Sequence, residues 1–162
     1  MNQSELLQFL EEKNIRFELT SHPAAFSMNE ERDYTLPHPE ADAKSLFVRD
    51  DKKRNYYLLT VRGNKRVNLK EFKRKHQTRS LSFASASDLE KYLHLTPGSV
   101  TPFGLLHDSD NHVQFYLDED FLKDEALLAC HPMINTATIT LKTSSLIHLL
   151  EENGHSVSLV EF

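Results

Sequence analysis

Three short segments, far apart in the chain, carry residue types that are costly for a purely structural role: residues 43–47, 97–104 and 130–136. In the first segment, Lys44 stands at the start of an apolar strand. A partly buried ammonium group there can hold a phosphate or a carbonyl oxygen as a point charge. An ordinary lysine at a strand end is the alternative interpretation. Taken together, the three segments predict a ligand pocket.

The second segment is a turn that contains two of the four glycines of the chain, Gly98 and Gly104, together with Pro97 and Pro102. Such glycines let main-chain amides approach a ligand closely or adopt a positive φ. The turn is not a Walker loop, because it lacks that loop's glycine spacing and its Gly-Lys-Ser/Thr end. A plain tight connection is the alternative.

The third segment places His131 and Pro132 directly before a run of small residues, 135–138. His131 can line a pocket, donate a hydrogen bond or act as a general acid or base, and a core histidine bonded to the backbone is the alternative. We interpret the neighbouring Cys130 as structural. Nothing in the sequence supplies the base or the cationic setting that a thiol nucleophile needs.

The composition argues against several classes of protein. A single cysteine cannot form an internal disulfide, and the nine histidines show no spacing typical of metal ligands. We therefore expect no metal site and no cofactor. The chain begins without a basic region followed by an apolar stretch, and nowhere do about 18 apolar residues follow one another. We expect a cytoplasmic protein that does not bind a membrane.

The net charge of −5 hides a strong asymmetry. Residues 44–79 hold 13 of the 19 Lys and Arg residues and only three acids, so this segment carries +10 and the remainder −15. A local positive face attracts phosphate backbones even when the whole molecule is anionic. Solvated strand ends and the outer face of one helix are the alternative explanation.

The chain has the size of one compact domain, and no linker or repeat divides it, so we expect a single domain over residues 1–162. The spacing of apolar and capping residues predicts helices over 4–13 and 69–76, one capped by Ser87 that ends near His94, and one capped by Thr143 or Ser144 that ends near Asn153. It also predicts a helical turn over 118–124 and strands over 16–19, 44–49, 56–61, 105–106, 113–117, 127–129, 135–141 and 157–160.

These elements alternate without a regular βαβ rhythm, and they include a hairpin. The pattern favours an α/β fold of the α+β type, a mixed, partly antiparallel central sheet with helices packed around it. Residues 21–42 are interrupted by prolines, and we expect a long loop or lid there with one short helix over 29–32.

In this order and spacing, the segments resemble the YbaK/ProX superfamily of aminoacyl-tRNA deacylases, and specifically its PrdX or ProXp-ala branch, which edits mischarged proline tRNA. The resemblance runs almost from end to end and is carried by residues 22–26, 37–38, 44–50, 81–85, 97–104, 131–132 and 135–138. It implies that a free-standing domain, acting in trans and without a cofactor, hydrolyses the ester between an amino acid and the terminal adenosine of a tRNA.

The resemblance also implies roles for individual residues. Lys44 matches the family's essential lysine, which holds and polarises the aminoacyl-adenosine end. The family's Gly-x-x-x-Pro loop, whose amides orient the ester carbonyl, is matched by Gly98, Ser99, Val100, Thr101 and Pro102. The residues expected to contact the substrate are Ser45, Phe47, Phe103, His131, Asn135 and Thr136. Ser45 departs from the family, which commonly has Asn there, and this leaves the substrate range open.

Under this interpretation the partner is mischarged tRNA(Pro), Ala-tRNA(Pro) first of all, and a prolyl-tRNA synthetase is a further candidate partner. The residues expected to contact tRNA phosphates come from the basic segment: Lys52, Lys53, Arg54, Arg62, Lys65, Arg66, Lys70, Lys73, Arg74 and Lys75. Two alternatives stay open. One is a non-catalytic module that binds tRNA or a synthetase, and the other is a deacylase for Cys-tRNA(Pro) or another small aminoacyl ester.

Overall fold

The structure, a computed structural model, describes residues 1–24 and 38–162. The helix predicted over 29–32, and most of the loop predicted over 21–42, lie outside the described residues. The elements are α1 (Gln3–Glu12), β1 (Phe17–Ser21), η1 (Pro39–Ala41), β2 (Ala43–Asp50), β3 (Tyr56–Arg62), α2 (Leu69–His76), β4 (Leu81–Phe83), α3 (Ala86–Leu93), η2 (Pro102–His107), β5 (Val113–Asp118), η3 (Glu119–Leu122), β6 (Leu127–Cys130), β7 (Ala137–Lys142), α4 (Thr143–Glu152) and β8 (Val157–Val160).

Two sheets form the framework. The larger sheet has the strand order β4-β2-β3-β5-β8, with antiparallel pairs on the β2 side and parallel pairs from β3 to β8. The smaller sheet, β1-β7-β6, is antiparallel. The predicted fold class, a mixed sheet with helices around it, is confirmed, although the strands are divided between two sheets.

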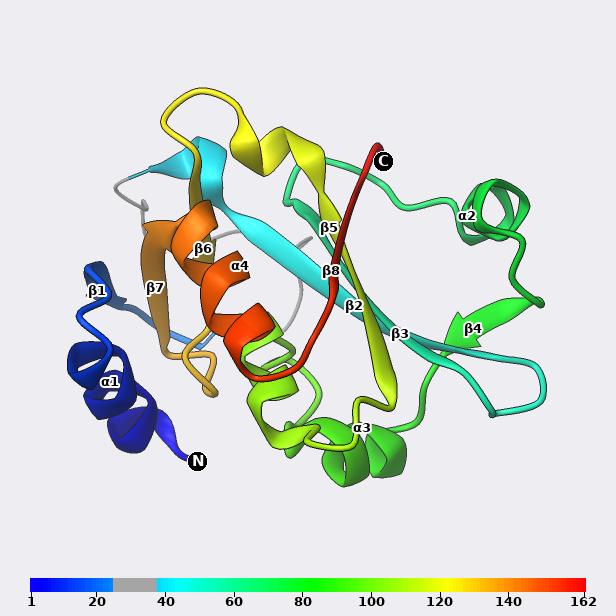
Figure 1. Cartoon of the computed structure of the whole chain (residues 1–162), viewed down its shortest axis with the longest axis horizontal. Helices are drawn as coiled ribbons and strands as arrows, with labels where there is room; N and C mark the ends of the chain where they lie inside the picture. The colour runs from blue at the N-terminus through cyan, green and yellow to red at the C-terminus, as the bar shows by residue number, and fades with distance from the viewer. Residues whose placement is uncertain (25–37) are drawn as a thin grey trace.

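The two faces of the larger sheet are covered differently. The main core lies on the face that meets the smaller sheet, and it includes residues of α1, α3 and α4. On the opposite face a second, smaller cluster holds Val48, Tyr57, Leu59 and Phe72, the last of which comes from α2. Figure 1 shows α1 and the smaller sheet at one end of the molecule and α2 with β4 at the other.

Local capping explains where the helices begin. The sequence pattern, Asn68 with Glu71 three residues later, predicts a cap for α2, and this is confirmed, since the Asn68 side chain accepts a hydrogen bond from the Glu71 amide at 3.1 Å. For α3 the predicted cap was wrong, because Ser85 and not Ser87 caps the helix by accepting from the Asp88 amide. Helix α4 begins at Thr143 without a side-chain cap.

One predicted strand is a helix. Residues 105–106 belong to the 3-10 helix η2, which begins at Pro102, a residue whose fixed φ and missing N–H suit the first helical position. Gly104 lets η2 pack closely on the end of α3. A Cβ atom there would lie 2.6 Å from the Leu95 Cδ1 atom and 3.1 Å from the Leu93 Cβ atom. The short edge strand β4 was not predicted. Among the described residues no helix is long and apolar enough to cross a membrane.

Candidate active site

The start of β2 lies beside the end of β6, and this contact joins the two sheets. Asp42 and Ala129 form an isolated parallel bridge, while the Asp42 carbonyl accepts a hydrogen bond from the Gly63 amide at 2.8 Å. Lys44 and His131 each lie two residues beyond the bridge, in the same chain direction. The first and third of the chemically suggestive segments are therefore neighbours in space.

The turn over residues 97–104 reaches the same place. Thr101, from this turn, lies beside the thiol of Cys130 and influences its pKa, and so does the Asp42 carboxylate. Burial, above all, raises the pKa of Cys130 to about 12. Because the thiol stays protonated and has no access to solvent, its role is structural, as the sequence indicated. Cys130 thus marks the point where the three segments meet.

Lys44 is half-buried near the start of β2. Burial lowers the pKa of its ammonium group, and the nearby charge of Arg66 lowers that pKa further. The ordinary strand-end lysine that was the alternative interpretation would be more exposed. A partly desolvated cation of this kind gains more than a surface lysine does when an anionic or strongly dipolar ligand approaches it.

Alternation along β2 places Lys44 and Ser45 on opposite faces of the sheet. The Ser45 hydroxyl is hydrogen-bonded to the buried Thr60 hydroxyl at 2.7 Å. Phe47, on the same face as Ser45, is buried in the main core and stacks on Tyr56. A single ligand that touches both Lys44 and Ser45 must therefore lie across the edge of β2.

Among the described strands, β4 pairs only with Val48–Asp50 of β2. The edge of β2 at Ser45 is therefore not covered by β4 and is open to such a ligand. The Phe47 carbonyl accepts from the Ala84 amide on the β4 side, whereas the Asp42 carbonyl faces β3. Alternation then directs the main-chain N–H and C=O groups of Ser45 toward the open edge. These two groups can bond a ligand that lies between Lys44 and the turn.

Within the turn, the amides are not equally available. Gly98 has a φ of 88°, and the Ser99 amide donates to the Thr96 carbonyl at 3.0 Å. Pro102 has no N–H group. Val100, which is half-buried, therefore remains the best candidate for a donor to a ligand oxygen, whereas the predicted contact residue Thr101 is completely buried. Phe103 is completely buried, so it supports the turn from the core side and is not exposed to a ligand.

Two histidines lie next to the turn. His131 is half-buried, and its Nδ1–H group donates to the Ala137 carbonyl at 3.1 Å. The His22 ring lies 6.3 Å from the His131 ring, and its Nε2 atom is hydrogen-bonded to the Thr138 hydroxyl at 2.7 Å. Asn135, half-buried, and Thr136, exposed, lie just before β7. His22 is absent from the predicted site residues, although it belongs to a stretch that carries the resemblance.

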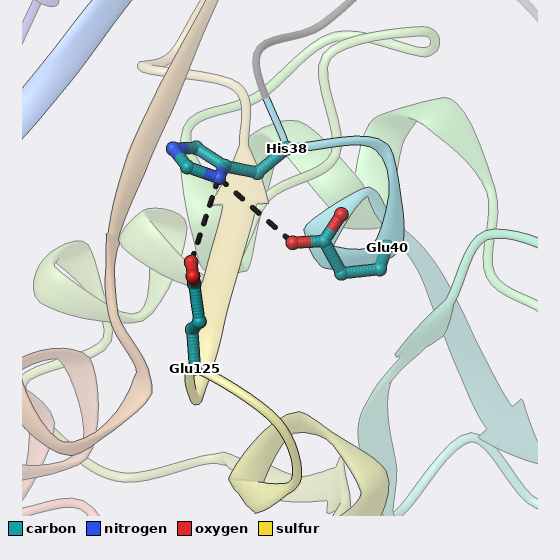
Figure 2. A group of neighbouring side chains, drawn as sticks. All are labelled: His38, Glu40 and Glu125. Atoms are coloured by element: carbon teal, nitrogen blue, oxygen red, sulfur yellow. Dashed lines mark ion pairs between the residues drawn. The ribbon is translucent and has the colours of Figure 1, made fainter.

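A second cluster that the sequence did not predict lies where the described chain resumes (Figure 2). The Nδ1 atom of His38 is 3.8 Å from a carboxylate oxygen of Glu40 and 3.8 Å from one of Glu125, and its Nε2 atom is 3.5 Å from one of Glu18. His38, Glu40 and Glu125 are metal-ligand types, and their ligand atoms lie within 4.8 Å of one another. Because the carboxylates are exposed, we describe the cluster as a group of surface ion pairs that ties the segment before β2 to the loop before β6.

The predicted phosphate-binding residues divide into two groups. Most are exposed, in the β2–β3 turn, in the loop between β3 and α2 (Arg66) or on α2: Lys52, Lys53, Arg54, Arg66, Lys70, Lys73, Arg74 and Lys75. Arg62 and Lys65 differ, because both form ion pairs with carboxylates of this chain. The Lys65 ammonium lies 2.9 Å from the buried Asp118 and 2.7 Å from Asp120, and Arg62 lies 3.3 Å from Asp124.

Comparison with known protein families shows the class of protein to which this chain belongs. The family model described as the aminoacyl-tRNA editing domain matches residues 22–149. The chain belongs to this family, and the resemblance that the sequence suggested is confirmed. It is accordingly an enzyme of the aminoacyl-tRNA deacylase class.

Individual relatives are similar over nearly their whole length. The "Prolyl-tRNA editing protein ProX" of Acetoanaerobium sticklandii is 33% identical, with 94% of this chain and 92% of the relative covered. The "Prolyl-tRNA synthetase associated domain-containing protein 1" of Xenopus laevis is 32% identical, with 98% and 95% covered. A crystal structure of a candidate trans-editing enzyme for prolyl tRNA synthetase, 20% identical, superposes with a TM-score of 0.68 over 100% of this chain and 98% of that one, which shows the shared fold.

Proposed function

We propose that this protein acts in trans to remove alanine from mischarged tRNA(Pro). The observation that carries the proposal is the meeting of three segments at Cys130: the start of β2 with Lys44, the turn with Thr101, and the segment with His131. Proline tRNA as the substrate is supported by the names of the relatives, both of which refer to prolyl-tRNA or its synthetase.

The proposed reaction is hydrolysis of the ester by water. The Lys44 ammonium holds the aminoacyl-adenosine end, while main-chain amides of the turn, that of Val100 first of all, donate to the ester carbonyl oxygen and share its developing negative charge. Water attacks the carbonyl carbon, the bond to the ribose oxygen breaks, and that oxygen takes a proton, which leaves free alanine and a tRNA with an intact ribose. A neighbouring ribose hydroxyl of the substrate can assist the attacking water.

No protein nucleophile is needed in this scheme. The ester is already activated, and one preorganised donor lowers the barrier by about 3 to 4 kcal/mol. The buried thiol of Cys130 is protonated and is not available for attack. His131, whose Nδ1–H group donates to the Ala137 carbonyl, is expected to help shape the pocket for the amino-acid moiety.

Selectivity is expected to come from the exclusion of proline. A site that fits a methyl side chain rejects a larger ring by steric clash, whereas a larger site rejects a smaller side chain only weakly. Ser45 has a shorter side chain than the family's usual Asn, and its hydroxyl is hydrogen-bonded to Thr60.

A panel of charged tRNAs tests the proposal. Purified protein is incubated with Ala-, Ser-, Cys- and Pro-tRNA(Pro), and the release of each amino acid is measured. We expect rapid release of alanine and none of proline. Faster release of cysteine than of alanine would favour the alternative that the protein is a deacylase for Cys-tRNA(Pro). Retention of charged tRNA on a filter without any release would favour the non-catalytic module.

A further inference from the structure

Phe83 has an unusual environment for an aromatic residue. Its side chain is 63% exposed, which makes it the most exposed large hydrophobic residue in the described part of the chain. It lies on β4, a three-residue strand at the edge of the larger sheet. Natural proteins protect sheet edges from unwanted pairing, and an exposed aromatic ring at an edge serves no packing purpose. The ring of Phe83 is therefore accessible to a ligand.

The position of Phe83 relates it to Lys44. Phe83 pairs with Val48 across the β2–β4 ladder, and Val48 lies four residues after Lys44 on a strand whose pairing with β3 is uninterrupted. By alternation the side chains of Lys44, Val48 and Phe83 lie on the same face of the sheet. Four residues of strand separate the two sites by about 13 Å. A short run of unpaired nucleotides can cover this length.

A basic hollow of about 640 Å³ lies beside Phe83, between α2 and β4. Leu81, which shares a strand face with Phe83, forms part of its wall. The lining contains three cations and no carboxylate: Leu69, Lys70, Lys73, Arg74, Gln77, Thr78, Ser80 and Leu81. The Lys73 ammonium donates to the Ser80 hydroxyl at 3.2 Å, so it is held at the rim of the hollow.

We infer that Phe83 and this hollow bind the unpaired 3′-terminal nucleotides that precede the terminal adenosine of the tRNA. The inference rests on the proposed function and extends it to a specific part of the substrate. A base stacks on the Phe83 ring, and the adjoining phosphates contact Lys70, Lys73 and Arg74. An aromatic platform beside cations is the arrangement that proteins use for single-stranded nucleic acid, whereas a paired stem would offer its phosphates but no base face to stack on.

The test compares two substrates that differ only in the upstream nucleotides. One is Ala-tRNA(Pro), and the other is the alanyl ester of adenosine alone. We expect Phe83→Ala to lower kcat/KM for the tRNA by about 10-fold, the value of one lost stacking contact, and to leave hydrolysis of alanyl-adenosine unchanged. Phe83→Trp should restore activity on the tRNA. Leu159→Ala, which removes an exposed side chain from the opposite edge strand β8, is the matched control and should behave like the wild type.

A binding measurement separates this inference from the proposed function. A fluorescent single-stranded oligonucleotide that ends in CCA is titrated with wild-type protein and with the Phe83→Ala and Lys73→Ala variants. Weaker binding by both variants supports the inference even if the wild type releases no alanine. If wild type hydrolyses Ala-tRNA(Pro) while Phe83→Ala binds the oligonucleotide and turns over the tRNA normally, the inference fails and the proposed function stands. An equal loss on both substrates would also overturn it.

Discussion

At the scale of single residues, Lys44 is the group on which the proposed chemistry depends. It combines a half-buried position with a neighbouring cation, Arg66, and both lower the pKa of its ammonium group. The unfavourable partial burial of the Lys44 ammonium group is not offset by an ion pair, because no carboxylate is paired with Lys44 among the described ion pairs. A substrate that brings a phosphate or a polarised carbonyl would supply the missing partner.

The lowered pKa of Lys44 has a consequence for the pH dependence of activity. The charged form holds the substrate, so activity should be lost as the pH rises through a value below the ordinary lysine pKa of 10.5. Initial rates of deacylation, corrected for spontaneous ester hydrolysis, measure this alkaline limb. Lys44→Arg should move the limb to higher pH, since a guanidinium group does not titrate in this range. An unchanged limb in that variant would show that another group titrates.

At the scale of elements, the turn and η2 form a unit whose packing places the candidate donors. Gly104 sits against Leu93 and Leu95 at the end of α3, with no room for a Cβ atom. We expect Gly104→Ala to lower the free energy of unfolding by about 1 to 3 kcal/mol through overpacking, and to reduce activity by displacing Thr101. Urea denaturation measures the first effect.

Gly154→Ala is the matched control for that variant. A Cβ atom at Gly154 would meet nothing within 4 Å, but the backbone has a φ of +89°. Gly154→Ala should lower the free energy of unfolding by about 1 kcal/mol through backbone strain alone, and it should leave deacylation unchanged. If both variants lose activity equally, packing of η2 against α3 is not what places the turn.

The basic residues offer a second contrast between elements. Lys65 pairs with Asp118, a fully buried carboxylate, so Lys65→Met should lower the free energy of unfolding by about 3 kcal/mol. Lys73 is exposed on α2, so Lys73→Met should change stability by less than about 0.5 kcal/mol and weaken tRNA binding. Denaturation and filter binding of the two variants check these opposite outcomes. If Lys65→Met weakened tRNA binding and Lys73→Met did not, the tRNA interface would lie at the end of β3 and not on α2.

The fold was predictable where the signals are local. The bounds of α2 follow from Asn68 and Glu71, and the hairpin of β2 and β3 follows from two apolar runs around a polar turn. The cap of α3 was ambiguous, because Ser85 and Ser87 both stand three residues before an acid. Residues 105–106 form an apolar run too short to distinguish a strand from a helix, and Pro102 decided the outcome.

The site was predictable only in part, because its assembly depends on contacts between distant segments. Residue types and the family resemblance pointed to Lys44, the turn and His131. The bridge between Asp42 and Ala129, which brings them together, has no local signature. The pairing of Lys65 with Asp118 is equally long-range, and the charge pattern that predicted a phosphate contact for Lys65 could not reveal it.

At the scale of the whole molecule, charge is separated along the long axis. The segment 44–79 carries +10, and it includes α2 and the β2–β3 turn at one end of the molecule in Figure 1. The rest of the chain carries −15. Such a distribution orients a polyanion during its approach, because only the basic end attracts it. The acceptor end of the tRNA would then extend along β2 from α2 toward Lys44.

This arrangement predicts a strong dependence of activity on salt. The logarithm of kcat/KM for Ala-tRNA(Pro) should fall linearly with the logarithm of the salt concentration, as expected when phosphate contacts release counterions. Lys73→Met should reduce the slope by about 1. Hydrolysis of alanyl-adenosine, which lacks the upstream phosphates, should depend little on salt. Equal slopes for the two substrates would contradict a role for the basic end.

The most direct test of the account is single-turnover release of alanine from Ala-tRNA(Pro) by the wild type and by Lys44→Ala, with circular dichroism and urea denaturation as checks on folding. We predict that the variant keeps the wild-type fold and loses activity by at least about 100-fold, the usual effect of removing one group that stabilises the transition state. Release at the wild-type rate by a folded Lys44→Ala protein would contradict the assignment of the active site to the meeting point of β2, the turn and His131.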